Sequence, residues 1–258
     1  MEIDVFDEIQ RLRQSGLKAA LATVVQIRDA GPNFRTAKML IRDDGSRMGS
    51  LGGGAMEADV WAAAHDVIRD EKSRLMTFDK VDVFVEPILP TPRIVIFGAG
   101  HIATQVSKIA TVAGFRSTIV DNRPEYANTD LFPEAETIYS DSFERAFAEI
   151  EPNENTYVII VTTGHEDDQR VLHWAVQTDA RYIGMIGSKR KIRTIAEQLE
   201  KEGISRERLE RVNMPIGLDI GAVLPEEIAV AIVAEVIHNR RAGFKHPLSK
   251  KLYRSSHS

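Results

Sequence analysis

The 258-residue sequence contains no cysteine. It therefore cannot form a disulfide, a thiolate metal site or a thiol nucleophile, which excludes a large part of the usual catalytic repertoire. Long apolar runs are also missing, because no stretch approaches the ~20 residues that a membrane helix needs, so we expect no membrane association. A formal net charge of −5 with dispersed lysine and arginine gives no electrostatic footprint for nucleic acid.

The overall composition is that of a globular protein, with 43% hydrophobic and 28% charged residues and a mean hydropathy of −0.20. The first residues alternate acids and bases around a helical apolar stripe instead of forming a basic start and an apolar run, so they do not predict a secretion signal. We therefore expect a cytoplasmic protein. Internal repeats and low-complexity segments are absent from the sequence, and its length is sufficient for two domains.

A domain boundary is predicted at Leu89-Pro-Thr-Pro92, because neither proline can donate to a β-ladder. Residues 1–89 are predicted to form a smaller α+β domain, residues 93–245 a Rossmann-like domain, and residues 246–258 a basic tail. For the first domain the pattern predicts helices and strands in the order helix 3–14, strands 18–28, 38–41 and 46–51, helix 55–70, and strands 73–78 and 81–88. In the second, amphipathic helix-length stretches alternate with short apolar strands at 94–97, 117–121, 157–162 and 182–186. That alternation predicts a doubly wound parallel sheet with helices on both faces.

The motif Gly98-Ala-Gly-His-Ile-Ala103 follows the first of these apolar strands and begins a helical pattern. Its first glycine suits a tight turn, its second lets phosphate approach the backbone, and Ala103 allows the helix to pack on its strand. Asp121, which ends the next strand about 20 residues on, stands where a ribose-binding acid is expected in such folds. The pattern therefore predicts a nucleotide-type crevice, and the alternative is a helix-packing turn that holds no ligand.

Two further strand ends, Thr162–Asp168 and Gly184–Lys191, are predicted to lie at the same edge of the sheet. Lys189, Arg190 and Lys191 oppose the positive end of a helix dipole, which a bound phosphate would relieve. A solvated basic turn is the alternative interpretation. His165 could cap a helix, lie in the core, or act as a base beside Glu166 to Asp168, but the sequence shows no partner nucleophile, so the catalytic residues stay unknown.

These loops carry a family resemblance. The second half resembles the Rossmann-type domain of the XdhC/CoxI family through Phe97–His101, Val120–Pro124, Thr163–His165 with Asp168, Tyr182–Lys189, Pro215–Ala222 and Pro225–Ala229. The first half is similar to the family's other domain through Ala22–Val25, Gly31, Arg35, Ala37–Met39, Asp44-Gly45, Gly49 and Gly52–Gly54 with Glu57. Together these motifs cover nearly the whole chain.

The resemblance implies a factor that matures and inserts the molybdenum cofactor, as molybdopterin or its dinucleotide form, for a xanthine dehydrogenase-type molybdenum hydroxylase. A cysteine desulfurase would supply the terminal sulfur, and a homodimer is expected because family members commonly self-associate. No resident metal site is predicted. We expect an anionic pterin-cofactor site between the two domains, and its candidate residues are Gly98, Gly100, His101, Asp121, Arg123, Gly164, His165, Gly187, Ser188, Lys189, Gly52, Gly53, Gly54 and Glu57.

Three departures from the family pattern bear on activity. Many members have a cysteine after the glycine triplet, where this chain has Ala55, so a thiol at that position cannot handle sulfur or molybdenum here. The segment from Gly31 to Lys38 is shortened. Leu224 replaces a common threonine before Pro225, which removes an expected side-chain helix cap.

Two other functions remain open at this point. An NAD(P)-dependent oxidoreductase could use the same crevice, with Asp121 accepting from a ribose hydroxyl or Arg123 pairing with a 2′-phosphate. The second alternative is an interaction scaffold that has lost its ligand, which Ala55 and the shortened segment suggest. The predicted helix 226–240 has an apolar side that would cover a core, and its small residues also permit packing against a second copy of the chain.

Overall fold

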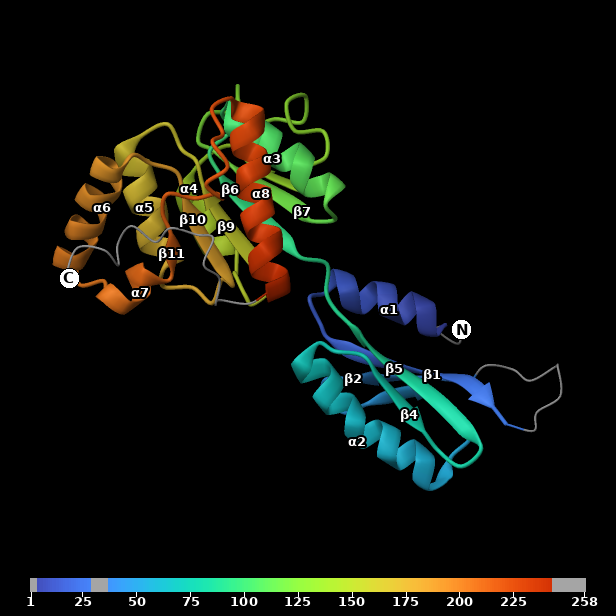
Figure 1. The fold of residues 1–258 in the computed structure, drawn as a ribbon. Coiled ribbons are helices and arrows are strands. Elements are labelled where there is room, and N and C mark those ends of the chain that lie inside the picture. The colour runs from blue at the N-terminus through green and yellow to red at the C-terminus, as the bar shows by residue number, and fades with distance from the viewer. Residues whose placement is uncertain (1–3, 29–36, 243–258) are drawn as a thin grey trace. The chain divides into compact units, whose positions relative to one another are not determined.

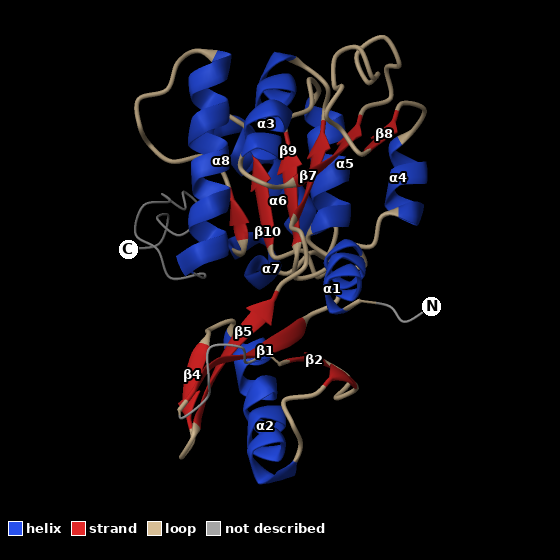
Figure 2. Cartoon of the chain, turned by 90° about the vertical axis from the view of Figure 1, so that its right-hand side faces the viewer, coloured by secondary structure: helices blue, strands red, loops and turns tan. Residues whose placement is uncertain are grey.

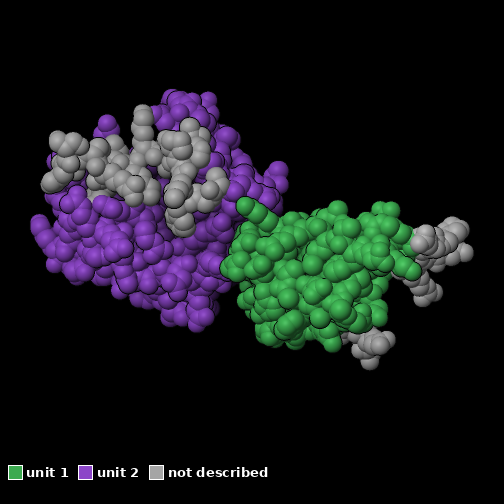
Figure 3. Space-filling model, turned by 60° about the horizontal axis from the view of Figure 1, so that its bottom comes forward, with its two compact units in different colours: residues 1–91 green, residues 92–258 purple. Residues whose placement is uncertain are grey.

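The computed structural model describes residues 4–28 and 37–242 of the chain. The predicted basic tail and most of the shortened segment 31–38 lie outside these ranges. The chain divides into two compact units, residues 1–91 and residues 92–258 (Figure 3). Each unit has its own hydrophobic cores, and each is described by itself. No helix in the described ranges is both long and apolar enough to cross a lipid bilayer.

The first unit contains an antiparallel sheet with the strand order β3-β2-β1-β5-β4. Its elements, in chain order, are α1 (Val5–Gln14), β1 (Ala19–Ile27), β2 (Lys38–Arg42), β3 (Arg47–Gly49), α2 (Gly54–Asp70), β4 (Arg74–Thr77) and β5 (Val81–Ile88). The alternation along β1 decides what covers the sheet, because successive side chains point to opposite faces. Ala20 and Ala22 pack with α2, whereas Ala19 and Leu21 pack with α1. The predicted smaller α+β domain is thereby confirmed.

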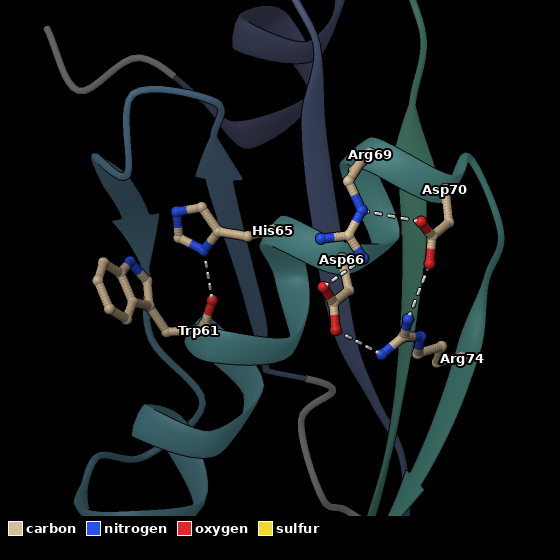
Figure 4. Close-up of polar contacts among 6 residues, drawn as sticks. All are labelled: Trp61, His65, Asp66, Arg69, Asp70 and Arg74. Carbon is tan, nitrogen blue, oxygen red and sulfur yellow. Dashed lines mark hydrogen bonds and ion pairs between the residues drawn. The ribbon is translucent and has the colours of Figure 1, made fainter.

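The exposed side of α2 is tied to the sheet by the side chains drawn in Figure 4. Trp61 donates from Nε1 to the carbonyl oxygen of Gly45 at 3.0 Å, in the predicted turn between β2 and β3. The ring of His65 packs edge-on against Trp61 with 5.2 Å between the ring centroids. Trp61, although its side chain is exposed, therefore has a structural role, because it holds the turn between β2 and β3 against α2.

The last turns of α2 also form a network of charged side chains with β4 (Figure 4). Arg74 of β4 donates to Asp66 and Asp70, both at 3.1 Å, and Arg69 lies 2.7 Å from Asp66 and 3.0 Å from Asp70. Such exposed pairs each contribute little to stability, because water screens them. We therefore regard this network as a structural contact between α2 and β4 on the surface, and not as a functional site.

Glu8 of α1 joins that helix to the sheet through two arginines. It accepts from Arg11 Nε and Nη2, both at 2.7 Å, and from Arg42 Nε of β2 at 2.8 Å. These hydrogen bonds, opposed in part by burial, lower the pKa of Glu8 from 4.5 to about 2. A carboxyl group whose pKa is lower in the folded than in the unfolded state stabilises the fold above its unfolded pKa.

We expect Glu8→Gln to lower the free energy of unfolding at pH 7 by about 1 kcal/mol, a small effect because Arg11 is exposed and screened by water. The stabilisation by Glu8 is present above pH 4.5 and lost as the pH falls toward 2. The difference between the parent and the variant in denaturation curves should therefore be largest at pH 7, smaller at pH 4.5 and smallest at pH 2.5. A difference that persisted unchanged at pH 2.5 would contradict this assignment.

The second unit is a six-stranded parallel sheet with the order β11-β10-β9-β6-β7-β8. Its elements are β6 (Arg93–Phe97), α3 (His101–Val112), β7 (Arg116–Val120), β8 (Thr137–Tyr139), α4 (Phe143–Glu149), β9 (Thr156–Ile160), α5 (His165–Ala175), β10 (Tyr182–Met185), α6 (Lys189–Lys201), α7 (Arg206–Glu210), β11 (Val212–Asn213) and α8 (Pro225–Ala242). The order reverses between β6 and β9, which are neighbours in the sheet although β7 and β8 come between them in the chain. This is the switch point at which doubly wound sheets bind ligands.

Helices cover both faces of the parallel sheet (Figures 1 and 2). α3 and α8 lie side by side on one face with Ile94, Ile96 and Ile159, while α4, α5 and α6 pack on the other with Val95, Val158 and Ile160. The strands are buried on both sides, as their continuous apolar runs predict. The predicted Rossmann-like, doubly wound fold is thus confirmed, and α8 is a core-covering helix, with Ile232 and Val236 fully buried.

The differences from the predicted elements lie at ends and edges. β9 ends at Ile160, so Thr162 belongs to the following loop, and the edge strands β8 and β11 were not predicted because they have only three and two residues. The missing threonine at Leu224 is compensated. Glu227 Oε2 accepts from the backbone N–H groups of Val223 and Leu224 at 2.8 and 3.1 Å, which caps α8 from inside its first turn.

Candidate functional site

The parallel sheet brings several predicted site residues to one edge. Because β6, β9, β10 and β11 run in the same direction, the loops that follow them emerge together at their carboxyl ends. These loops lead into α3, α5, α6 and α8. The glycine triplet of residues 52–54 belongs to the first unit, where Gly53 is the N-cap and Gly54 the first residue of α2.

The two glycines of the loop after β6 have different roles. Gly98 has a φ of +110°, and a Cβ built there would lie 2.4 Å from the carbonyl oxygen of Val161. Gly100 has a φ of −78° and a ψ of −176°, which any residue can adopt, and a Cβ there would meet no described atom within 4 Å. Gly98 is therefore required by the close approach of two loops, whereas Gly100 borders open space that a ligand could fill.

The N-terminus of α3 is open to an anion. Gly100 is its N-cap residue and supplies no side-chain cap, and the first turn of this helix contains no acidic residue. Backbone N–H groups in a first helical turn have no acceptor within the helix. His101, the first residue of α3, is exposed, and Ala103 is buried against the sheet as the motif predicts. This terminus can therefore receive a phosphate or carboxylate through backbone donors.

Asp121 is buried and satisfied by the protein itself. Its carboxylate accepts from Ala99 N at 2.8 Å and from Arg123 at three donors, N at 3.1 Å, Nε at 2.8 Å and Nη2 at 2.7 Å. The guanidinium of Arg123 also lies over the ring of Tyr126, 4.5 Å from its centroid. A ribose hydroxyl could reach the Asp121 carboxylate only by displacing one of these donors. The same pairing engages the Nε and Nη2 atoms of Arg123.

The loop after β9 is less suited to an anion. Gly164 is the N-cap of α5 and His165 is its exposed first residue, but Glu166 and Asp167 follow in the first turn. Burial raises the pKa of Asp167, and the negative charges of Asp121 and Asp168 raise it further. These carboxyl groups already complement the dipole of α5. A phosphate is therefore better placed at α3 or α6 than at α5.

The N-terminus of α6 presents basic side chains. Ser188 caps this helix by accepting from Lys191 N at 3.3 Å, and Lys189 and Arg190 are exposed. Lys191 instead forms an ion pair with Asp168, whose side chain is fully buried. The basic cluster predicted from the sequence is therefore divided between a structural lysine and two exposed cations.

Gly187 lies beneath the first turn of α6. A Cβ at this position would lie 3.3 Å from side-chain carbons of both Lys191 and Ile192. Gly187 is thus a packing residue, and it has no opening of the kind found at Gly100. Lys189, by contrast, lines a cavity of about 420 Å³ together with the loop that follows β11.

In the first unit, the glycine triplet is organised by Glu57. The Oε2 atom of Glu57 accepts from Ser50 Oγ at 2.8 Å, Leu51 N at 3.0 Å and Gly53 N at 2.9 Å, and Oε1 accepts from Arg47 Nη1 at 3.0 Å. The Ser50 hydroxyl and the two backbone donors lower the pKa of the Glu57 carboxyl. All three glycines have positive φ, from +78° to +111°, and border space free of described atoms within 4 Å. Glu57 therefore positions this loop from within.

We expect Glu57→Ala to lower the free energy of unfolding by about 1–3 kcal/mol, because it leaves the buried N–H group of Leu51 and the partly buried N–H group of Gly53 without their acceptor. The contribution of Glu57 is present above the ordinary carboxyl pKa of 4.5 and is lost as the pH falls through the lowered value. Chemical denaturation at pH 7 measures the loss, and Glu57→Gln, which keeps one oxygen acceptor, is the matched control. Equal stability of Glu57→Ala and the parent would contradict this role.

Several residues of the sheet edge had no role in the sequence prediction. Glu235 of α8 accepts from Gly217 N at 2.6 Å and from Tyr182 Oη at 2.7 Å, and burial together with Glu235 raises the pKa of Tyr182 well above 10. Gly184 permits close packing of Ile216, since a Cβ there would lie 2.4 Å from Ile216 Cδ1. The family resemblance through Pro215–Ala222 was the sequence signal for this loop. No cluster of three His, Asp or Glu side chains that could hold a metal ion occurs in the described part of the chain.

Comparison with known families gives two matches. Residues 94–236 match the family described as the XdhC Rossmann domain, and residues 12–79 match the XdhC and CoxI family. The family resemblance seen in the sequence is thereby confirmed.

Comparison with individual proteins gives relatives that are longer than this chain. The Escherichia coli K12 protein YqeB is 29% identical over 251 residues, covering 91% of this chain and 46% of YqeB. A Bacillus subtilis protein named as a probable xanthine dehydrogenase component is 30% identical over 165 residues, covering 64% of this chain and 48% of that protein. The chain thus spans about half the length of these relatives. A solved structure of a Bacillus halodurans protein, described as a xanthine dehydrogenase, superposes with a TM-score of 0.56 at 21% identity, covering 95% of this chain and 98% of that one, which shows a shared fold.

Proposed function

Because the chain belongs to the XdhC and CoxI family, we propose that it binds the molybdenum cofactor and holds it for a xanthine dehydrogenase-type molybdenum hydroxylase. This cofactor is a pterin dithiolene with a phosphate, extended in one form by a nucleotide, so its site must receive an anion joined to a flat polar ring. One observation carries the proposal. α3 and α6 both begin at the same sheet edge without an acidic residue in the first turn, and each has an exposed basic residue at its first position, His101 and Lys189.

The residues present fit such a group. The open space beside Gly100 is where a phosphate can approach the backbone, and the first-turn N–H groups of α3 would donate to it. Lys189 would add a charge-assisted contact, and His101 and His165 would flank the anion. Gly98, Gly187, Asp121 and Glu57 would act indirectly by fixing the loops. The cofactor would bring the molybdenum and its sulfur ligands, and these residues would bind and orient it.

Sulfuration and delivery are further parts of the proposal. The chain contains no cysteine, and Ala55 follows the glycine triplet, so a thiol of this chain cannot carry the sulfur. We propose that a cysteine desulfurase supplies sulfur to the bound cofactor and that an apo-hydroxylase then receives it. The name of the Bacillus subtilis relative supports a hydroxylase of the xanthine dehydrogenase type as the recipient.

A homodimer would present paired sites for this transfer. The apolar side of α8 is already used against the core, so a second copy would have to contact other surfaces. Light scattering of the purified chain at several concentrations tests this part, and a monomeric mass throughout would contradict it.

Anaerobic titration tests the binding proposal directly. The purified chain is mixed with molybdenum cofactor released from a hydroxylase, and bound molybdenum and pterin are measured after rapid gel filtration. We expect co-elution of both, and faster reconstitution of apo-hydroxylase from the loaded chain than from free cofactor. Absence of co-elution at cofactor concentrations well above the protein concentration would overturn the proposal.

The oxidoreductase alternative receives no specific support from the site. Asp121 and Arg123, the two residues assigned to the ribose end of NAD(P), are bonded to each other. Tight binding of NADH or NADPH with turnover of a carbonyl substrate would favour this alternative over the cofactor carrier. Recovery of the hydroxylase in a pulldown by a chain unable to bind cofactor would favour the scaffold.

A further inference from the structure

The cavity beside Lys189 is large enough for a small ligand. Its volume of about 420 Å³ lies within the range of roughly 300–1,000 Å³ that is usual for small-molecule sites. It lies wholly within the second unit, at the carboxyl ends of β10 and β11. The lining has two parts, the segment Pro215–Ala222 and the helix residues Lys189, Ile228 and Ala231.

The wall formed by this segment is held in place by three hydrogen bonds. Ile216 N donates to Met185 O at 3.0 Å, Gly217 N to Glu235 Oε2 at 2.6 Å, and Leu218 N to Ala231 O at 3.2 Å. Gly217 has a φ of +98° and lies against Ala231. The wall is thus attached to β10 and to α8, so a ligand would enter a largely preformed site.

The lining combines two opposite charges with apolar walls. Lys189 and Asp219 are its charged side chains among the described residues, and both are exposed to solvent. Ile220, which is 56% exposed, and Ile228 supply apolar surface that a flat ring would cover. Such a site suits a ligand with an anionic group at one end, an apolar planar body, and hydrogen-bond donors at the other end.

We infer that this cavity holds the fused 2-amino-4-oxo ring of a phosphorylated pterin or guanine nucleotide. The Asp219 carboxylate accepts from the ring N–H and the exocyclic amine, which lie side by side and match its two oxygens. Lys189 contacts the phosphate. Adenine has an acceptor nitrogen where guanine and pterin have the N–H, so it would oppose a carboxylate.

This inference rests on the proposed function, because it assigns the ring of the cofactor to a place next to the anion site. Neighbouring strands lie about 4.8 Å apart, so β6 and β10, which flank β9, are separated by about 10 Å. A nucleotide-extended cofactor could therefore reach from the cavity to the Gly100 loop along the same sheet edge. GMP, with one phosphate on its ribose, would use Lys189 without the Gly100 loop.

Calorimetric titration of the full chain with GMP, IMP and AMP tests the ring assignment. IMP keeps the ring N–H but lacks the amine, so we expect affinity to decrease from GMP to IMP to AMP, with GMP at least about tenfold tighter than AMP. Asp219→Asn should abolish this preference. Lys189→Ala should weaken all three monophosphates by about tenfold or more and leave guanosine unaffected.

Two neighbours of these residues provide matched controls. Arg190→Ala removes an exposed cation next to Lys189, and Glu226→Gln removes an exposed acid of the first turn of α8, and neither residue lines the cavity. Both should bind GMP as the parent does. Displacement of GMP by 6-hydroxymethylpterin would identify the pterin as a ligand, and failure of displacement would leave the guanine nucleotide as the ligand.

Equal affinity for GMP and AMP, no measurable binding of GMP, or a preference that survives Asp219→Asn would overturn the inference. If one of these results occurs while the chain still binds molybdenum cofactor, the proposed function stands and the ring lies elsewhere. If the GMP preference and its loss in Asp219→Asn are observed but the cofactor does not bind, the ring site stands and the proposed function fails.

Discussion

Gly100→Val should abolish most cofactor binding without unfolding the chain, whereas the same substitution at Gly98 should unfold the second unit. At Gly100 the backbone is extended and a Cβ meets no described atom within 4 Å, so a valine can be accommodated and would project into the proposed phosphate position. We expect stability within about 1 kcal/mol of the parent. Cofactor affinity should fall at least about tenfold, equivalent to roughly 1.4 kcal/mol.

At Gly98 both the conformation and the space forbid a side chain. The positive φ of +110° is strained for valine, and its Cβ would lie 2.4 Å from Val161 O in the loop after β9. A residue forced into such a backbone region loses about 1–3 kcal/mol, and the overlap with Val161 adds to this. Circular dichroism melts and anaerobic cofactor titration of the two variants measure both effects. Cofactor binding by Gly100→Val equal to that of the parent would show that the cofactor does not approach this loop.

Asp168→Ala should be among the most destabilising substitutions in the second unit. The Asp168 side chain is fully buried, pairs with Lys191 of α6, and accepts from Thr162 Oγ1 at 2.5 Å. Lys191 itself is only 14% exposed. Removing the carboxylate would leave a mostly buried ammonium without its counter-charge, which typically costs about 3–5 kcal/mol.

A double-mutant cycle with Lys191→Ala provides the control. If the ion pair carries the effect, the double variant should be less destabilised than the sum of the two single variants, by at least about 1 kcal/mol. Additive effects would instead show that Asp168 stabilises the fold through Thr162 and packing. Because the pair fixes the start of α6, Asp168→Ala should also weaken the contact of any phosphate with Lys189.

The polar groups of the sheet edge are thus of two kinds. Asp121, Asp168 and Glu235 are buried and bonded to backbone or basic groups, and they hold the loops that surround the candidate site. His101 and Lys189 are exposed at helix starts. A substitution of a buried acidic residue should change stability and ligand binding together, whereas a substitution of His101 or Lys189 should change ligand binding alone.

The sequence by itself determined the alternation of strands and helices, the position of the glycine loop at Gly98 to Gly100, and the basic start of α6. These features depend on local periodicity and on residues close together in the chain, so they can be read from a single sequence. The cap of α8 also comes from residues close together in the chain, but Glu227 provides it and residue 224 does not.

Only the tertiary structure decided which of these residues face a ligand. The motif assigns the tight turn to Gly98 and the phosphate approach to Gly100, but only the structure shows that the carbonyl of Val161, which is distant in the chain, excludes a side chain at Gly98. Asp121 likewise accepts from Ala99 of the loop after β6, and Lys191 pairs with Asp168 of α5. No spacing along the chain encodes these contacts between separate segments. The cavity at Lys189 depends on β11, too short for periodicity to show, and on Gly217 bonding to Glu235 of α8. Contacts between segments distant in sequence depend on the register and packing of the whole sheet, so local patterns could place the loops at one edge but could not specify the site they form.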